Sequence, residues 1–309
     1  MTLSILDFPA PAVLAALQPY QGLWHGAIFG ENTEWVIEDN IEGLLDYNSR
    51  VADQPIPQAD GEMQLGRWAA GRTVVLPFVI MGSVLTHAAE RQAWLRAFAP
   101  DAAHSQSWLA FRAGERVLVA RGRMTRRGLE TSPMMGRAGA SRGVVEIKLT
   151  DPRVYDGLRG LRSLVVPLGE AVGGGFDLEV EELPLDMTEP SGGVSVANNQ
   201  GNVEAWPVIR IRNLDPADNI TEFELQNVTT GVTVHMIVTI APGQTLVLDF
   251  DRLMLAAPGP HVHIDGSSRF GGWQHPRVPL TLAPGNNLMA GTFTGGDPEV
   301  RIDWLEPTL

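Results

Sequence analysis

Apolar and polar residues alternate with a period of two along most of the chain. Val145, Ile147 and Leu149 fall on one side of such a segment, and Glu146 and Lys148 fall on the other. The same alternation recurs over residues 209–212, 222–225, 246–251 and 300–304. One apolar and one polar face per strand is typical of antiparallel sheets packed as a sandwich or a barrel. The pattern therefore predicts a mainly β protein.

One segment follows the helical period instead. Residues 87–99 are rich in alanine and place Trp94, Leu95 and Phe98 on one face. Thr86 is a suitable N-cap, and Pro100 cannot continue a helix. We therefore predict a single α-helix between these two residues.

Turn residues and charge divide the chain in two. The 33 glycines and 22 prolines among 309 residues argue against long helices. After residue 160, turn signals such as Gly173-Gly-Gly175 and Pro242-Gly243 recur at short intervals, which is typical of one β-sandwich. Residues 1–155 carry 15 basic and 16 acidic residues, whereas residues 156–309 carry 8 basic and 20 acidic ones. We predict two domains, 1–157 and 158–309.

Composition excludes several functional classes. A net charge of −13 argues against nucleic acid or an anionic membrane as the main partner. Without cysteine, the chain has no disulfide, thiolate nucleophile or cysteine-ligated metal. No apolar run approaches the roughly 18 residues that span a bilayer, and the N-terminus lacks the basic and apolar regions of a signal peptide. We therefore expect no membrane insertion.

No catalytic or cofactor-binding residue emerges from the sequence. Ser141 lies in a G-x-S-x-G pattern, but a strand follows it where a nucleophile elbow needs a helix. His261 and His263 share one face of a predicted strand and, with Asp265 and His275, could ligate a metal, although such histidines are more often surface residues. We predict no enzyme, no cofactor and no metal site.

Two groups of residues are candidates for partner contacts. Eight arginines lie between Arg112 and Arg142, and from this run we predict a partner interface at Arg121, Arg123, Arg126 and Arg127. The alternative is an ordinary solvated face. Trp273 lies in a glycine-rich loop and, with His261 and His263, is predicted to form a peripheral surface that contacts the host. The alternative is that Trp273 closes the end of the sandwich.

The order of these features resembles siphophage distal tail proteins. In the first half the matching residues are Phe29-Gly30, Trp35-Val-Ile37, Gly43-Leu44, Arg50, Asp60-Gly61, Leu65-Gly66, the strand 72–82, Trp94-Leu95 and Asp151-Pro-Arg-Val-Tyr155. In the second half they are Asn199-Gln-Gly201, the segment 205–211, Asn227-Val-Thr-Thr-Gly231 and Pro284-Gly285-Asn286. The sugar-binding patterns W-x-x-E-x-R and H-x-N-x-R of galectins are absent.

The resemblance implies both a fold and a role. The fold is an N-terminal β-barrel or split-barrel-like ring domain with one α-helix, followed by a galectin-like antiparallel β-sandwich. The role is a homohexameric ring that joins the tail tube to the tail tip or baseplate. Its implied partners are the tail tube protein, the C-terminus of the tape-measure protein and the tail-tip hub protein, while DNA passes through the lumen without specific binding.

The resemblance also implies a location in the virion, at the tail tip, after assembly in the host bacterial cytoplasm. The alternative function is a carbohydrate-binding β-sandwich protein that contacts the host cell envelope. That alternative depends on Trp273, His261 and His263.

Overall fold

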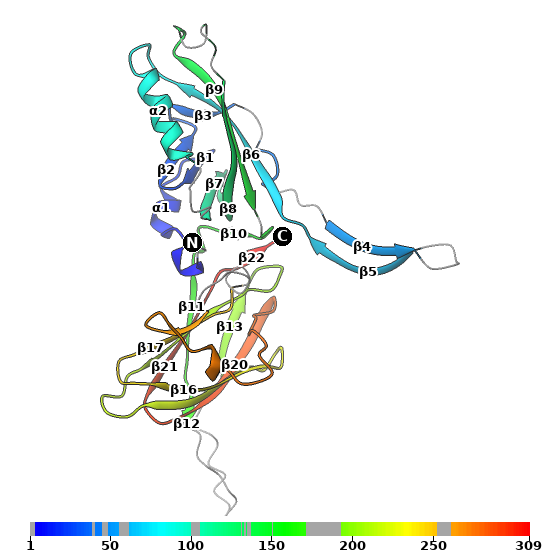
Figure 1. The fold of residues 1–309 in the computed structure, drawn as a ribbon, viewed down its shortest axis with the longest axis vertical. Coiled ribbons are helices and arrows are strands. Elements are labelled where there is room, and N and C mark those ends of the chain that lie inside the picture. Colours follow the sequence, from blue (N-terminus) through cyan, green and yellow to red (C-terminus); the bar gives the residue numbers. More distant parts are fainter. Residues whose placement is uncertain are drawn as a thin grey trace, which may run out of the picture. The chain divides into compact units, whose positions relative to one another are not determined.

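The computed structural model describes residues 4–38, 41–44, 49–55, 62–99, 106–130, 132, 134, 137–149, 151–170, 193–251 and 261–309, and of residues 49–55, 62–68 and 170 only the backbone. The protein is mainly β, as predicted. It divides into two compact units (Figure 1). The first contains Asp7–Gly160 and Pro307–Leu309, and the second contains Ser4–Leu6 and Leu161–Glu306.

The first unit is built on one nine-stranded sheet. Its main path runs β2-β1-β7-β8-β9-β6-β3, and β10 and β22 extend it from β8. Because β2 and β3, at the two ends of this path, also contact each other, the sheet forms a nearly closed barrel. The bounds are β1 Gln21–Trp24, β2 Ala27–Gly30, β3 Trp35–Ile37, β6 Arg72–Met81, β7 Ser107–Ala113, β8 Arg116–Leu129, β9 Ala140–Leu149, β10 Val154–Asp156 and β22 Pro307–Thr308.

Short elements complete this unit. A separate antiparallel hairpin consists of β4, Ser49–Pro55, and β5, Glu62–Ala69. The helices are η1 Ile5–Asp7, which spans the division between the units, α1 Pro11–Ala15 and α2 His87–Ala97. Helix α2 is the predicted one, but Thr86 makes no side-chain cap bond to it. The hydroxyl of Thr86 instead accepts a hydrogen bond from the N–H of Ser83, and the hydroxyl of Ser83 accepts one from the N–H of Thr86.

Helix α2 packs into the core of the first unit. Trp94 and Phe98 are both fully buried, and their ring centroids lie 5.4 Å apart. Trp94 also meets Phe78 of β6 edge-on at 5.9 Å. Gly143 of β9 lies directly beneath the indole, because a Cβ at that position would stand 2.9 Å from Trp94 Cζ2. The glycine therefore lets the helix approach the sheet closely.

The second unit is a sandwich of two sheets. One has the order β11-β21-β14-β17-β18-β19, and the other has the order β12-β20-β15-β16 with β13 also on β20. All pairs are antiparallel except the short pair of β12 with β20, which is parallel. The bounds are β11 Arg162–Val166, β12 Gly169–Glu170, β13 Ser195–Asn199, β14 Val208–Asn213, β15 Ile220–Asn227, β16 Val232–Ile240, β17 Thr245–Asp249, β18 Val262–Ile264, β19 Ser267–Ser268, η2 Phe270–Gly272, β20 Gly285–Thr294 and β21 Pro298–Trp304.

The predicted alternation is confirmed in both units. Residues predicted to face inward are nearly all less than 2% exposed: Val145, Ile147, Leu149, Ile209, Ile211, Phe223, Leu225, Leu246, Leu248, Phe250, Val300 and Ile302. Trp304 is slightly more exposed, at 4%. Most of the intervening polar residues, such as Glu146 and Lys148, are partly or fully exposed, but Asp249, Asp251 and Asp303 are buried. Burial of one apolar face per strand therefore explains both cores.

Four asparagines are fully buried at turns of the second unit: Asn199, Asn213, Asn227 and Asn287. Asn287 donates to the carbonyls of Ala283 and Gly285 and accepts from the side chain of Asn227. Asn213 donates to the carbonyls of Asp218 and Ile240. These amides satisfy backbone groups that the turns would otherwise leave buried and unpaired.

Asp215 shapes the turn between β14 and β15, and its pKa predicts a pH effect. The N–H groups of Asp218 and Ala217 donate to its carboxylate at 2.8 and 2.7 Å, which lowers its pKa below 3.8. A lowered folded-state pKa adds stability above about pH 3.8, and this stability is lost as the pH falls through the lower value. We expect Asp215→Asn to destabilise the protein at pH 7, with a difference from wild type that shrinks below pH 4.

Thermal unfolding from pH 2.5 to 7 measures this difference. Asp218→Asn is the matched control in the same turn, since Asp218 contributes its backbone N–H and carbonyl to the hydrogen bonds of the turn. A difference between wild type and Asp215→Asn that stays constant across the range would contradict the assignment.

Candidate functional site

Arg121, the first residue of the predicted partner interface, is buried. It is 1% exposed, its guanidinium lies 5.3 Å from the Trp108 ring centroid, and Nη2 lies 4.0 Å from the Asp151 carboxylate. Trp108 is its direct neighbour on β7. The arginine therefore faces the interior, and the prediction of a surface contact is corrected for this residue.

Arg127 is half-buried and binds the end of helix α2. Its Nη1 donates to the carbonyls of Leu95 and Phe98, the latter at 3.1 Å. These carbonyls lie in the last turn, where a cation is favoured by the helix dipole and by the unpaired acceptors. Arg127 therefore has a structural task.

Replacing Arg127 with alanine is expected to lower the free energy of unfolding by about 1–2 kcal/mol, because two carbonyls lose their donor. Chemical denaturation measures the change. Arg126→Ala is the matched control, expected to cost about 0.5 kcal/mol or less, since Arg126 makes only an exposed ion pair with Glu146. Equal losses in the two variants would contradict the assignment.

Arg123 and Arg126 lie on the outer face of β8. Arg126 pairs with Glu146 at 3.0 Å. Arg123 stands directly opposite Lys148 in the β8–β9 ladder, both side chains are exposed, and neither has an ion-pair partner within the described ranges. Like charges in opposed positions repel, so an incoming carboxylate would be favoured there. We call Arg123, Arg126 and Lys148 the basic patch. Lys148 was not predicted to be part of this surface, because only the β8–β9 register brings it beside Arg123.

Trp273 is not exposed. It is 2% accessible, and its ring centroid lies 5.4 Å from that of Phe250 and 5.7 Å from that of Phe270. The turn η2 directs the indole into the sandwich, where a bridge joins its backbone to Met236 of β16. The indole cannot stack on a sugar, which corrects the prediction of an exposed loop. Its burial agrees with the alternative of a tryptophan inside the sandwich.

His261 and His263 are half-buried at β18. His263 Nδ1 accepts a hydrogen bond from the N–H of Gly266 at 3.3 Å. Over the residues that the structure covers, no three histidine, aspartate or glutamate side chains gather in a way that could hold a metal. Ser141 is buried inside strand β9, so its backbone does not form a nucleophile elbow. Gly173-Gly-Gly175 lies outside the described residues.

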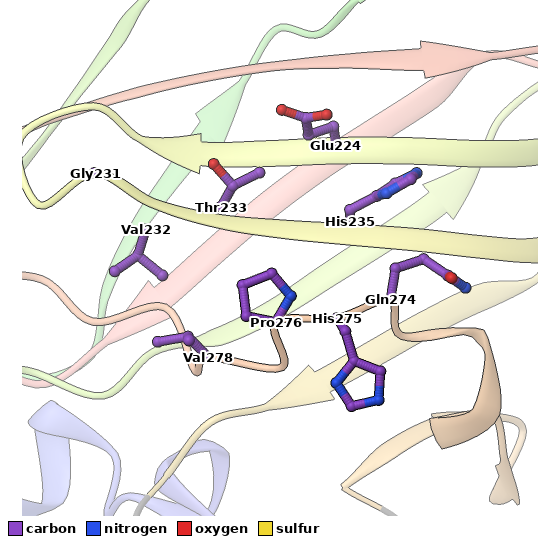
Figure 2. A pocket seen from close by; sticks show the side chains of 9 residues that line it. All are labelled: Glu224, Gly231, Val232, Thr233, His235, Gln274, His275, Pro276 and Val278. Atoms are coloured by element: carbon purple, nitrogen blue, oxygen red, sulfur yellow. The ribbon is translucent and has the colours of Figure 1, made fainter.

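A cavity of about 430 Å³ opens beside β16 in the second unit. Figure 2 shows Glu224 on β15, Thr233 and His235 on the neighbouring β16, and Gln274, His275 and Pro276 on the adjoining loop. Gly231, Val232 and Val278 complete the lining. The loop is fixed to the strand by the N–H of Gln274, which donates to the carbonyl of His235 at 2.9 Å. This cavity could not be predicted from the sequence, because its two sides are some 40 residues apart along the chain.

The cavity is weakly acidic. His235 Nε2 lies 2.6 Å from Glu222, so Glu222 has a partner. Glu224 is exposed, and no ion pair joins it to any side chain in the described part of the chain. Among the described residues that line the cavity there is no arginine or lysine. A bound group with a positive charge would therefore be favoured over an anion.

Among the described residues, no helix combines the length and apolar character needed to cross a membrane. No protein-family model and no curated protein matches the chain. Solved structures do match it. Over 94% of its length the chain is similar to the Dit protein (gp 19.1) of phage SPP1, with a TM-score of 0.63, 12% identity and 100% of that protein covered.

The chain has the fold of the SPP1 Dit protein. The Dit structure is described as a paradigm of the hub adsorption apparatus in phages that infect Gram-positive bacteria. The chain is also similar to a chain of the phage P2 baseplate in its activated conformation with Ca, at a TM-score of 0.51 and 8% identity over 92% of its length and 97% of the other. A chain of the same baseplate with Sr is similar at a TM-score of 0.51 and 7% identity, again over 92% of this chain and 97% of the other. The Dit fold therefore spans both units.

Proposed function

We propose that this protein is a structural component of a siphophage tail tip, where six copies form a ring between the tail tube and the baseplate. The observation that carries the proposal is the extent of the likeness to SPP1 Dit, which covers 94% of this chain and 100% of that one. A match confined to one β-sandwich would indicate only a widespread fold, because such folds serve many functions. Here the likeness extends over both units.

The first unit would form the ring. A closed ring repeats one heterologous interface, so each copy must offer two complementary surfaces. The basic patch is one candidate surface, since Arg123 and Lys148 lack a carboxylate partner among the described residues. The ring would contact the tail tube protein, the tape-measure protein and the tail-tip hub protein, and DNA would cross its lumen unbound. The protein would be assembled in the host cytoplasm and act without catalysis.

Carbohydrate binding through Trp273 loses its support. The indole of Trp273 is buried, and His261 and His263, which were predicted to form the same surface, are only half-exposed. A tail-tip structural role therefore remains the better candidate.

Ring formation tests the proposal. Negative-stain images of the purified protein should show six-fold rings, and light scattering should give the mass of six chains. The chain staying a monomer at high concentration, also with tail-tube protein added, would overturn the proposal.

The double charge reversal Arg123→Glu with Lys148→Glu tests the basic patch within that ring. It should weaken self-association about tenfold, a typical effect of reversing interfacial charges. Arg116→Glu, on the same strand and equally exposed, is the matched control. Rings that are unaffected by the double variant would remove the patch from the interface but leave the ring itself.

A further inference from the structure

The cavity beside β16 lies at an open sheet edge. Strand β16 is the last in its sheet, with β15 on one side only. On its other side the loop segment Trp273–Gln274 covers the strand at Met236 and His235. The strand begins at Val232, so its first residues extend beyond that cover and line the cavity.

The ladder fixes which backbone groups face the cavity. The carbonyl of His235 accepts from Gln274, so it points away from β15. Residues two apart on a strand direct their N–H and C=O groups to the same side. The register from His235 to Thr233 is regular, opposite Glu224 and Gln226. The N–H and C=O of Thr233 therefore point into the cavity, and no loop backbone group in the described residues bonds to them.

We propose that this edge binds an extended, basic segment of another polypeptide as an added strand. The N–H and C=O of Thr233 offer the main-chain bonds. The loop residues Gln274 and Pro276 form the opposite wall. The cavity volume of about 430 Å³ admits a few residues of such a segment.

Glu224 selects a basic side chain. A strand added to β16 would run about 10 Å from β15, two inter-strand spacings away. An arginine or lysine lying along the sheet covers that distance and places its charge at the Glu224 carboxylate. Glu222 is already occupied by His235, so Glu224 is the uncompensated charge of the lining. An anionic ligand would be repelled, and among the described lining residues no tryptophan, tyrosine or phenylalanine offers a face on which a sugar could stack.

Two labelled peptides test the proposal on the full chain. Capped Ser-Val-Arg-Val-Ser and Ser-Val-Glu-Val-Ser, each with a rhodamine label, differ only in the central charge. Fluorescence anisotropy should show binding of the arginine peptide and at least tenfold weaker binding of the glutamate peptide. Hydrogen–deuterium exchange should slow over residues 231–236 when the arginine peptide is present. Both measurements work for a monomer or a ring, so the result does not depend on the proposed ring.

Two variants separate charge from backbone. Glu224→Gln should weaken binding of the arginine peptide about five- to tenfold, the effect of losing one charge-assisted bond. Glu299→Gln, an exposed carboxylate on the other sheet, should leave binding unchanged. Thr233→Pro should abolish the protection of residues 231–236, since proline removes the outward donor at a position where an edge strand tolerates it.

The contrary outcomes are specific. If Glu224→Gln and Glu299→Gln weaken binding of the arginine peptide equally, the peptide is attracted by the overall negative charge of the protein, and the proposed site is wrong. Protection of residues 231–236 by N-acetylglucosamine but not by the arginine peptide would make it a saccharide site. If Thr233→Pro lowers the melting temperature of the protein, peptide binding by Glu224→Gln is the measurement that tests the proposal. No protection by any probe would overturn the proposal.

Discussion

Replacing Trp94 with alanine is expected to lower the free energy of unfolding by about 3–5 kcal/mol, the cost of a large cavity in a close-packed core. The indole is fully buried and contacts Phe78 at 5.9 Å and Phe98 at 5.4 Å. Gly143 beneath it offers no side chain that could fill the space. The cavity should therefore remain, and helix α2 should lose its main anchor to the sheet.

Urea denaturation followed by circular dichroism measures this loss, with one transition fitted for each unit. The transition of the first unit should shift and that of the second should not, because Trp94 lies only in the first core. Leu85→Ala, two residues before the helix and 93% exposed, is the control and should change stability by about 0.5 kcal/mol or less. A loss below 1 kcal/mol for Trp94→Ala would mean that the helix is not anchored by its indole.

Replacing Asn287 with alanine is expected to destabilise the second unit by about 3 kcal/mol, since several buried polar groups lose their partners at once. Its amide donates to Ala283 O at 2.8 Å and to Gly285 O at 3.1 Å. Its oxygen accepts from Ala283 N at 2.9 Å and from Asn227 at 3.0 Å. The side chain thus joins the turn before β20 to the end of β15.

Two further variants test the reason for this loss. Asn286→Ala removes a neighbouring amide that is exposed and bonds only to Asn198, so it should cost about 0.5 kcal/mol or less. Asn287→Leu keeps the side-chain volume and removes the polar atoms, and it should destabilise as much as alanine does. If Asn287→Leu is as stable as wild type, the hydrogen bonds are not what makes the buried amide necessary.

The cores could be predicted from periodicity alone, because burial of a strand face is a local property of its sequence. Val145, Ile147 and Leu149 needed no knowledge of their neighbours to be placed inward. Helix α2 was predictable for the same reason. Its cap was not, because the hydroxyl of Thr86 had a competing partner in Ser83.

The surfaces could not be predicted in this way. Arg121 and Arg123 are two residues apart, yet only Arg123 is exposed, since Arg121 meets Trp108 across the ladder. Trp273 sits among glycines, which suggests an exposed loop, but the turn before it directs the indole inward. The basic patch and the cavity each join strands or loops distant in sequence. Their residues are therefore known only once register and topology are known.

The pairing of β10 with β22 has a consequence for how the chain could be rebuilt. Tyr155 lies directly opposite Pro307, and the whole of Leu161–Glu306 falls between these two strands in sequence. All of the second unit except Ser4–Leu6 is thus an insertion into the sequence of the first unit, and the chain enters and leaves this insertion at two strands that pair with each other. A short linker from Gly160 to Pro307 would remove Leu161–Glu306 and keep the pairing of β10 with β22. A different domain inserted between the same two residues would leave the chain order of the first unit's strands unchanged.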